Sequence, residues 1–278
     1  MVNKEGAELV GIFAVPHAPL VARDWARLPE GVKTRLGEDY HEMGRRITAC
    51  KPDVLIIVAP DHWTNFFINN LPTVLIGLGE EHDPPPEPFL RDFRPALRGA
   101  PTFARHLVDT ALADGFEPSL SYRMALDHGF CLPLMKMELA HLPPIVPMVL
   151  NSLEPPMPSV ARCAAWGRLL LSAIKTSPEQ LRVAILASGG LSHSIGEATM
   201  GDIDIPFDEE CMRLLAGSDD AALFRYLDQN MDAAGNGSHE IRNWLVAHGA
   251  ADGGKFELVD YYAVPEVYVG CGFASWAV

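Results

Sequence analysis

The 278-residue sequence contains no closely spaced pair of cysteines. Its five cysteines, Cys50, Cys131, Cys163, Cys211 and Cys271, are scattered along the chain without a Cys-x-x-Cys motif. An odd, dispersed set is typical of reduced thiols and argues against a disulfide framework. We therefore expect a cytoplasmic protein.

The sequence also lacks a long uncharged apolar stretch, so no membrane span is expected. Its start, Met-Val-Asn-Lys-Glu-Gly-Ala-Glu, is polar and acidic and does not resemble a secretory signal. With 48% hydrophobic residues, the chain is long enough for one large domain or two small ones. Because we find no internal repeat and no low-complexity tract, we expect a single catalytic domain over residues 1–278.

Positive charge is scarce and does not gather in blocks. The chain has 22 Lys and Arg against 36 Asp and Glu, a formal net charge of −14. Nucleic-acid binding normally needs a cationic face that displaces counterions, so we expect no nucleic-acid partner. A small-molecule enzyme or a protein-binding domain remains.

Several common catalytic and nucleotide-binding motifs are absent. No Gly-x-Gly-x-x-Gly opens a helix, which argues against a bound dinucleotide, and no phosphate loop with its Lys-Ser/Thr ending occurs. His239-Glu240 is followed by Ile-Arg-Asn and is therefore not part of a His-Glu-x-x-His zinc motif. The segment Gly190–Ser194 approaches a serine nucleophile elbow, but its last residue is Ser instead of Gly.

Apolar strand-like runs alternate with helix-like stretches over much of the chain. The near-continuous apolar runs indicate strands that are buried on both faces, and the alternation predicts an α/β fold. We expect a central, mostly parallel or mixed sheet that is flanked by helices and has its active site at the strand ends. The expected strands are Leu9–Val15, Val54–Ala59, Thr73–Leu78, Ile145–Leu150, Val183–Ala187 and Phe256–Val264. The expected helices lie near 34–50, 101–114, 130–140, 159–175, 207–216, 219–229 and 238–248, and the proline-rich segment 81–99 is expected to be an ordered surface loop.

Of the ten histidines, three follow expected strands within a few residues. His17 follows the first strand, His62 the second, and His193 lies in the Gly-rich turn after Val183–Ala187. In open α/β sheets, ligands gather outside the carboxyl ends of the strands, so these side chains meet at one edge if the strands are parallel. His128 precedes a helix in Leu-Asp-His-Gly-Phe, and His239 stands beside Glu240.

A single loop histidine is more often a hydrogen-bonded residue than a functional one, and each of these could be explained in that way. Their shared placement at strand ends favours a common site. Two neutral imidazoles and one carboxylate suit a divalent transition metal and leave open positions for substrate and oxygen. Iron and zinc both accept imidazole, so the residue types do not separate them.

Five short motifs in order resemble the class III extradiol ring-cleavage dioxygenases. They are Pro-His17-Ala-Pro, Ala-Pro-Asp61-His62, Asp127-His128-Gly-Phe-Cys-Leu-Pro-Leu, Ser188-Gly-Gly-Leu-Ser-His193 and Ser238-His-Glu240-Ile. The family includes the catalytic subunit of protocatechuate 4,5-dioxygenase and the dihydroxyphenylpropionate dioxygenases. Each motif is weak alone, but together they cover nearly the whole chain.

The resemblance implies a role for each of five residues. His17, His62 and Glu240 would bind Fe(II) as a facial triad. His193 would be the acid/base residue, and His128 would line the oxygen and substrate side of the pocket. The implied activity is the insertion of both atoms of O2 into a catechol or a related dihydroxylated aromatic, such as a dihydroxypyridine or a carboxylated catechol. The product would be a ring-opened semialdehyde.

The neighbouring residues have weaker implied roles. Asp127 and Asp61 would orient imidazole rings, although each could equally be a turn residue. Ser192 inherits no nucleophilic role, and His239 is not implied as a ligand; both would lie beside the site or support it. Arg123 could supply a cation for a substrate carboxylate, as could Arg182 or Arg242.

Two alternatives stay open on the same scaffold: a zinc-dependent enzyme and a non-catalytic binding protein. The presence of His193 and His128 beside a complete triad favours catalysis. Some relatives pair this chain with a small helical subunit, or carry it fused. With the first implied ligand already at His17, no fused helper domain fits, so we expect a homo-oligomer or a separate small helper subunit.

Overall fold

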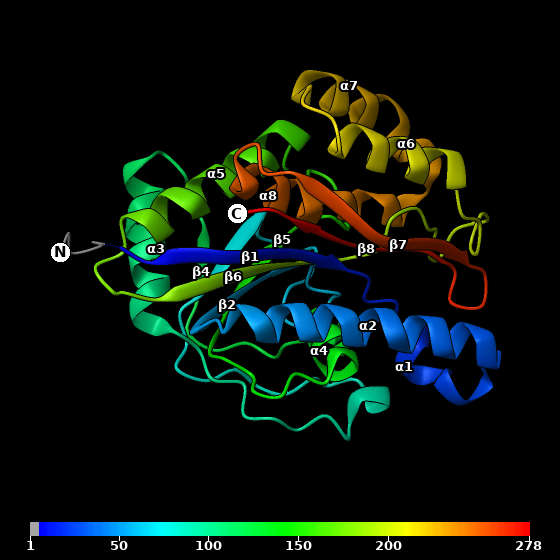
Figure 1. Ribbon diagram of the computed structural model, residues 1–278, viewed down its shortest axis with the longest axis horizontal. Coiled ribbons are helices and arrows are strands. Elements are labelled where there is room, and N and C mark those ends of the chain that lie inside the picture. Colours follow the sequence, from blue (N-terminus) through cyan, green and yellow to red (C-terminus); the bar gives the residue numbers. More distant parts are fainter. Residues whose placement is uncertain (1–5) are drawn as a thin grey trace.

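The computed structural model describes residues 6–278, so that residues 1–5 of the polar start lie outside the described part. Eight strands form one sheet in the order β4-β3-β5-β2-β6-β1-β8-β7 (Figure 1). They are β1 (Glu8–Val15), β2 (Val54–Ala59), β3 (Val74–Gly77), β4 (Ser119–Ser121), β5 (Ile145–Leu150), β6 (Arg182–Ser188), β7 (Phe256–Val264) and β8 (Val269–Trp276).

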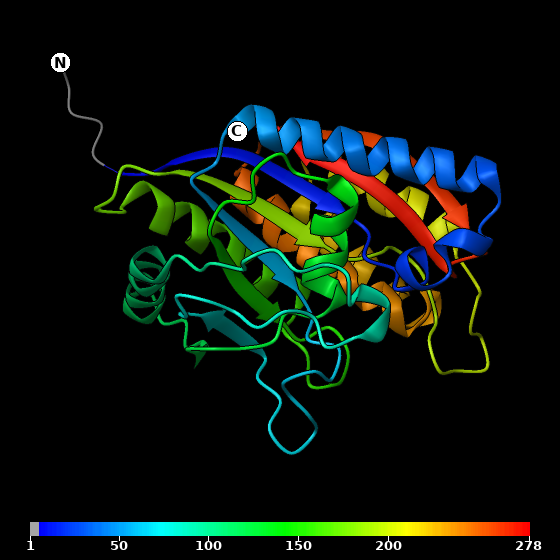
Figure 2. The same ribbon diagram turned by 90° about the horizontal axis from the view of Figure 1, so that it is seen from below.

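The sheet is mixed, with a parallel centre. β5, β2, β6 and β1 run parallel as neighbours, whereas β3 and β8 join this group in antiparallel register. The arrowheads of β1, β2 and β6 point the same way in Figure 2. The predicted α/β class with a mostly parallel or mixed sheet is therefore confirmed, and three carboxyl ends meet at one edge.

Helices cover both faces of the sheet. α2 and α4 lie below it in the view of Figure 1, and α5 and α8 lie above it. The α-helices are α1 (Leu20–Arg23), α2 (Glu30–Cys50), α3 (Pro101–Ala113), α4 (His128–Met137), α5 (Val160–Lys175), α6 (Ile205–Leu215), α7 (Asp220–Asn230) and α8 (Ile241–Ala251). Residues 6–278 also form four short 3-10 helices: η1 (Trp25–Arg27), η2 (Pro88–Leu90), η3 (Met231–Ala234) and η4 (Asn236–Glu240).

Each central strand contributes side chains to two hydrophobic cores, one on each face of the sheet. In β1, Ile12 and Ala14 pack into the core beneath α3, α5 and α8, while Phe13 and Val15 pack toward α2 and α4. Successive side chains of a strand point to opposite faces, so an apolar run is buried on both. This burial fixes the ends of the parallel strands, and hence the residues that follow them.

Two strands were missed by the sequence prediction. β4 is a three-residue, largely exposed strand, and β8 includes Gly270-Cys271-Gly272, where glycines weaken a strand pattern. Close packing favours glycine at one of these positions, because a Cβ at Gly272 would lie 2.9 Å from the Trp244 ring. The last predicted helix begins at Ile241 instead of 238, because η4 occupies Asn236–Glu240.

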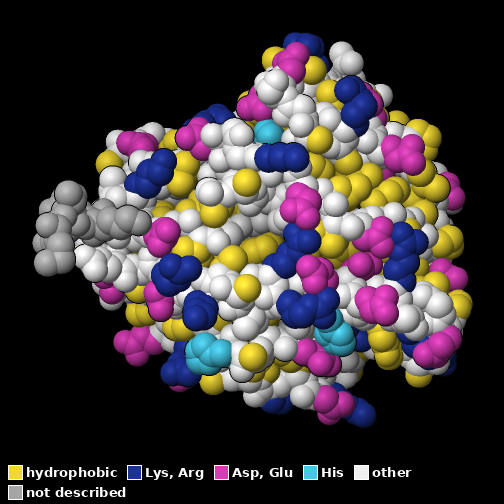
Figure 3. Space-filling model, viewed as in Figure 1, with side chains coloured by type: hydrophobic (Ala, Val, Ile, Leu, Met, Phe, Trp, Pro, Cys, Tyr) yellow, Lys and Arg dark blue, Asp and Glu magenta, His cyan; other side chains and the backbone are white. Residues whose placement is uncertain are grey.

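Within residues 6–278, no helix is long and apolar enough to cross a membrane. On the face shown in Figure 3, Lys and Arg side chains are interspersed with Asp and Glu and form no basic patch. The charge pattern of this face is therefore unlike that of a nucleic-acid-binding surface.

Candidate metal centre and active site

His17 and His62 reach the site from the ends of two parallel strands. His17 follows β1 and His62 follows β2, with β6 between these strands. Nε2 of His17 lies 3.2 Å and Nε2 of His62 lies 3.6 Å from Oε1 of Glu240. Glu240 ends η4 and is 2% exposed. Residues distant in the sequence thus converge on one carboxylate oxygen.

The protons on both imidazoles can be placed from their partners. Ser188 donates its hydroxyl to the carbonyl of Gly129 (2.5 Å), so its Oγ accepts from Nδ1 of His17 (2.9 Å). Nδ1 of His62 lies 3.3 Å from the Asp127 carboxylate, which can only accept when ionised. In the neutral rings, both Nε2 atoms therefore carry lone pairs and face Glu240.

His193 completes this convergence from the turn after β6. Its Nδ1 donates to the carbonyl of Leu191 at 2.9 Å, which leaves Nε2 as the lone-pair atom, 3.9 Å from Oε1 of Glu240. Gly237 of η4 packs directly against the imidazole: a Cβ at that position would lie 2.1 Å from Nε2. The ring is thus held by a hydrogen bond on one side and by a close backbone on another.

His128 lies at the first turn of α4, capped by Asp127, whose Oδ1 accepts from the Gly129 amide at 2.9 Å. Its ring centroid is 4.0 Å from that of His62. Nitrogen atoms of His17, His62 and His128 lie within 4.8 Å of one another. The structure therefore brings together all five residues that the resemblance implies.

The donor set fits a divalent cation. Lone pairs on Nε2 of His17 and His62 face a carboxylate oxygen, an arrangement that is repulsive unless a proton or a cation lies between them. Ligand atoms at about 2.1 Å from an ion in an octahedral site stand about 3 Å apart, close to the spacings observed here. His17, His62 and Glu240 could hold such an ion, with His193 and His128 beside it.

The pKa values show how the metal-free protein relieves this repulsion. Burial lowers the pKa of His62, but Asp127 and Glu240 outweigh it and raise the pKa to about 10. Burial raises the pKa of Glu240, but His17, His193 and His62 together hold it well below its usual value. The two partners thus favour an ion pair, in which a proton on His62 occupies the place of a cation.

His128 differs in charge from His62. Burial and the neighbouring His62 lower its pKa to about 4, against the opposing effect of Glu87. Burial raises the pKa of Asp127, but the interaction with His62 dominates and lowers it to about 2. His128 is therefore neutral at physiological pH beside an ionised Asp127.

The residues with weaker implied roles lie in distinct surroundings. Asp61 accepts from the amides of residues 64–66 and is a turn residue with no hydrogen bond to an imidazole. Asp127 orients His62 through both its ring and its amide nitrogen (2.6 Å). Ser192 is fully buried and bonds to Asp208, and His239 pairs with Asp232 and Arg242.

The three arginines considered for substrate recognition are engaged elsewhere. Arg123 forms an exposed ion pair with Asp83, and Arg182 begins β6, at the opposite end of that strand from His193. Arg242 is buried and donates to the carbonyl of Pro158. The prediction that one of these cations serves a substrate carboxylate gains no support from their contacts.

Three residues that hold the histidines were not singled out from the sequence. Ser188 supports His17, Glu87 accepts from Nδ1 of His128 (2.9 Å), and Gly237 packs on His193. Ser188 lies within a motif that the resemblance quoted. Glu87 belongs to the proline-rich segment, where no periodicity indicates which residue turns inward.

Comparison with known proteins bears on the class of enzyme. Residues 11–272 match the family model described as the catalytic LigB subunit of aromatic ring-opening dioxygenase. A 2,3-dihydroxyphenylpropionate/2,3-dihydroxicinnamic acid 1,2-dioxygenase from Paraburkholderia phymatum is 30% identical, over 82% of this chain and 85% of its own. A gallate dioxygenase from Pseudomonas putida is 28% identical over 62% of this chain and 52% of its own.

A solved structure supports the fold independently. The crystal structure of an uncharacterized protein from Escherichia coli K12 aligns with a TM-score of 0.65 at 18% identity, over 96% of this chain and 100% of that one. At this identity the likeness concerns the fold alone.

Proposed function

Because the chain belongs to the LigB family of aromatic ring-opening dioxygenases, we propose that it is an Fe(II)-dependent extradiol enzyme that inserts both atoms of O2 into a dihydroxylated aromatic ring. The observation that carries this proposal is the convergence of three Nε2 atoms, from His17, His62 and His193, within 3.9 Å of Oε1 of Glu240. Two of these nitrogens and the carboxylate form a metal triad, and the third stands beside it as a base.

Iron(II) bound by His17, His62 and Glu240 would supply open coordination positions and the redox chemistry that activates O2 toward a catechol. The protein's own part is proton transfer and orientation. Nε2 of His193 accepts the proton of a substrate hydroxyl and returns it later in the reaction. Its Nδ1–H bond to Leu191 O keeps that lone pair aimed inward.

His128 acts as a neutral hydrogen-bond acceptor on the substrate and oxygen side, because its Nδ1–H donates to Glu87. Asp127 fixes the tautomer of His62, and Ser188 fixes that of His17, so that each presents a lone pair to the metal. The ring-opened product is a semialdehyde or an analogous keto acid. Fe(II) is the metal of the proposal, and zinc is the alternative that the same donors accept.

The substrate is a catechol or a close analogue. The curated relatives are named for dihydroxyphenylpropionate and gallate, both carboxylated, so carboxylated catechols head the candidates, and dihydroxypyridines follow. We also propose that the protein acts as a homo-oligomer, which light scattering after gel filtration tests. Activity of the purified chain without any second polypeptide would argue against an obligate helper subunit.

Metal-dependent oxygen uptake tests the proposal. The metal-free protein is reconstituted anaerobically with Fe(II) or Zn(II) and offered catechol, protocatechuate, gallate, 2,3-dihydroxyphenylpropionate and a dihydroxypyridine. We expect O2 consumption with at least one substrate, in the iron form only, with a coloured ring-opened product. Turnover by the zinc form without iron would contradict the iron assignment, and binding without turnover in both forms would contradict catalysis.

A further inference from the structure

A buried carboxylate outside the histidine cluster accepts two hydrogen bonds from the residue that precedes His193. Asp208 of α6 is fully buried. Its Oδ1 accepts from the Ser192 amide at 2.7 Å, and its Oδ2 accepts from the Ser192 hydroxyl at 2.8 Å. The Tyr261 hydroxyl of β7 also donates to Oδ2, at 2.7 Å. One side chain thus ties a helix and an edge strand to the turn that carries His193.

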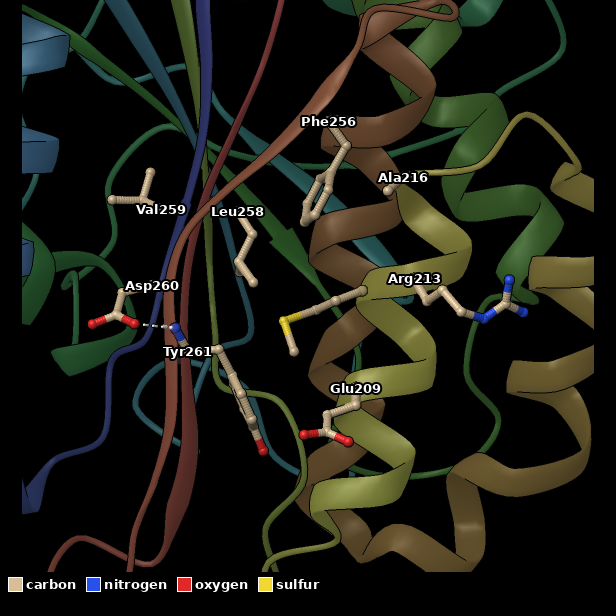
Figure 4. A pocket seen from close by; sticks show the side chains of 9 residues that line it. Glu209, Arg213, Ala216, Phe256, Leu258, Val259, Asp260 and Tyr261 are labelled. Atoms are coloured by element: carbon tan, nitrogen blue, oxygen red, sulfur yellow. Dashed lines mark hydrogen bonds between the residues drawn. The ribbon is translucent and has the colours of Figure 1, made fainter.

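The surroundings of Asp208 explain how Tyr261 reaches it. α6 packs alongside β7, and hydrophobic side chains gather between them on the surface shown in Figure 3. Figure 4 shows the cavity of about 520 Å3 between these elements, with the Tyr261 ring pointing from β7 toward α6 beside Glu209. The Tyr261 hydroxyl therefore reaches from β7 to Oδ2 of Asp208, the same oxygen that accepts from the Ser192 hydroxyl.

The His193 turn is also held by the Gly190 amide, which donates to Oε2 of Glu240 at 2.9 Å, and by backbone contacts with β8. Leu191 and Ser192 exchange backbone hydrogen bonds with Gly270 of β8, at 3.0 and 3.1 Å. A Cβ at Gly270 would lie 2.1 Å from Oδ2 of Asp208, so only glycine leaves room for the carboxylate. Because Nδ1 of His193 donates to Leu191 O, the ring direction depends directly on how this turn is held.

Burying a carboxylate costs more free energy than burying a neutral side chain, so a purely structural anchor would not need one. Burial raises the pKa of Asp208 to about 6, although the hydrogen bonds from Tyr261 and Ser192 oppose it. A buried charge is retained at this cost only where its hydrogen bonds are all made. Here the three donors that approach Asp208 come from the His193 turn and from the residue that braces it.

We propose that Asp208 is a positioning residue that holds Ser192, and through it aims Nε2 of His193 at the substrate hydroxyl. This inference rests on the proposed role of His193 as the acid/base group. In this proposal Ser192 also has a function, because its amide and its hydroxyl both donate to Asp208 and so hold the turn in place. Tyr261 supports the same carboxylate and has a smaller share of the effect.

The chain offers a matched control one residue away. Tyr262, next to Tyr261 in β7, donates its hydroxyl to Asp39 of α2 at 2.9 Å. Burial raises the pKa of Asp39 to about 6, as for Asp208. Within residues 6–278, neither member of this second Tyr–Asp pair forms a hydrogen bond or an ion pair with the His193 turn. Both pairs therefore join a tyrosine hydroxyl of β7 to a carboxylate of a helix. They differ because only Asp208 also bonds to the His193 turn.

The test compares Asp208→Asn and Tyr261→Phe with Asp39→Asn and Tyr262→Phe in the iron-loaded enzyme. We expect Asp208→Asn to lower kcat by about 10- to 100-fold with little change in KM and in bound iron, the usual loss when an outer support of a site is removed. Tyr261→Phe should lower kcat by a few-fold, and the control variants should stay within about twofold. The limb of the pH–rate profile that reports the acid/base group should shift only in the Asp208 and Tyr261 variants.

Hydrogen–deuterium exchange of the metal-free protein supplies a readout that needs no turnover. Peptides that cover residues 189–195 should exchange faster in Asp208→Asn and unchanged in Asp39→Asn. If Asp208→Asn does not fold, Tyr261→Phe carries the same comparison. Equal effects of the two pairs on kcat, or unchanged exchange at 189–195, would overturn the inference while the enzyme stays active. A wild-type protein that consumes no O2 with any diphenol would contradict the proposed function and the inference together.

Discussion

Oε1 of Glu87 lies 2.9 Å from Nδ1 of His128 and 3.0 Å from its backbone amide. Glu87 comes from the proline-rich segment and reaches a histidine that starts α4, 41 residues later. Because a carboxylate accepts from Nδ1–H, Nε2 of His128 faces the site as the lone-pair atom. The other carboxylate oxygen, Oε2, is buried and has no hydrogen-bond partner among the described residues.

Glu87 should therefore matter for turnover and not for metal binding. Glu87→Ala removes the acceptor and frees the His128 ring, a loss of about 1–3 kcal/mol, or roughly 5- to 150-fold in kcat/KM. Glu80→Ala, which removes an exposed carboxylate immediately before that segment, is the control and should leave the rate unchanged. Equal steady-state kinetics of Glu87→Ala and the control would show that His128 needs no such partner.

Replacing His193 should separate metal binding from catalysis. His193→Ala and His193→Phe should keep iron, since His17, His62 and Glu240 remain, but lose about 100- to 10,000-fold in kcat, the usual share of a positioned general base. Iron content and stopped-flow turnover are measured on the same samples. Near-full activity in either variant would contradict the acid/base assignment.

A methyl group at Gly237 should displace His193 without touching any proposed ligand. The added Cβ would lie 2.1 Å from Nε2 and Cδ2 of the ring, so the imidazole must move. We expect Gly237→Ala to bind iron normally and to lose at least about tenfold in kcat. Gly37→Ala, where a Cβ meets no neighbour within 4 Å, is the control. A fully active Gly237→Ala would mean that the ring tolerates displacement.

Metal affinity should depend on pH through His62. Its pKa in the metal-free protein is raised to about 10, so at neutral pH the ring is protonated and metal binding must displace that proton. The association constant should therefore rise by about tenfold per pH unit from this group and level off above its pKa. Titration with a divalent ion between pH 6.5 and 9, in buffers of different ionisation enthalpy, measures the proton released. An affinity independent of pH would contradict the protonated state of His62.

Much of the site was accessible from the sequence because it depends on parallel strands. His17, His62 and His193 follow apolar runs, and their meeting required only that these runs be parallel neighbours. The roles of Asp61 and Asp127 could not be distinguished from the sequence, since both residues precede a histidine and either could be a turn residue or orient an imidazole. The structure distinguishes them: Asp61 bonds to turn amides and Asp127 bonds to His62.

The supporting contacts could not be predicted because they depend on tertiary packing. Glu87 lies in a segment without periodicity, and Asp208 reaches Ser192 from a later helix. β8 was missed because its glycines lower the strand signal, although Gly270 and Gly272 leave room for Asp208 and Trp244. The sequence pattern shows where strands end, whereas such close approaches become visible only once the strands are assembled.

Mass spectrometry of the product formed under 18O2 tests the central claim most directly. The iron-loaded enzyme is offered its best catechol, and the ring-opened product is trapped before its carbonyl oxygen exchanges with water. We expect the product to carry both oxygen atoms of one O2 molecule and the ring to be opened beside, and not between, the two hydroxyl-bearing carbons. A product with an intact ring, or one without 18O, would contradict it.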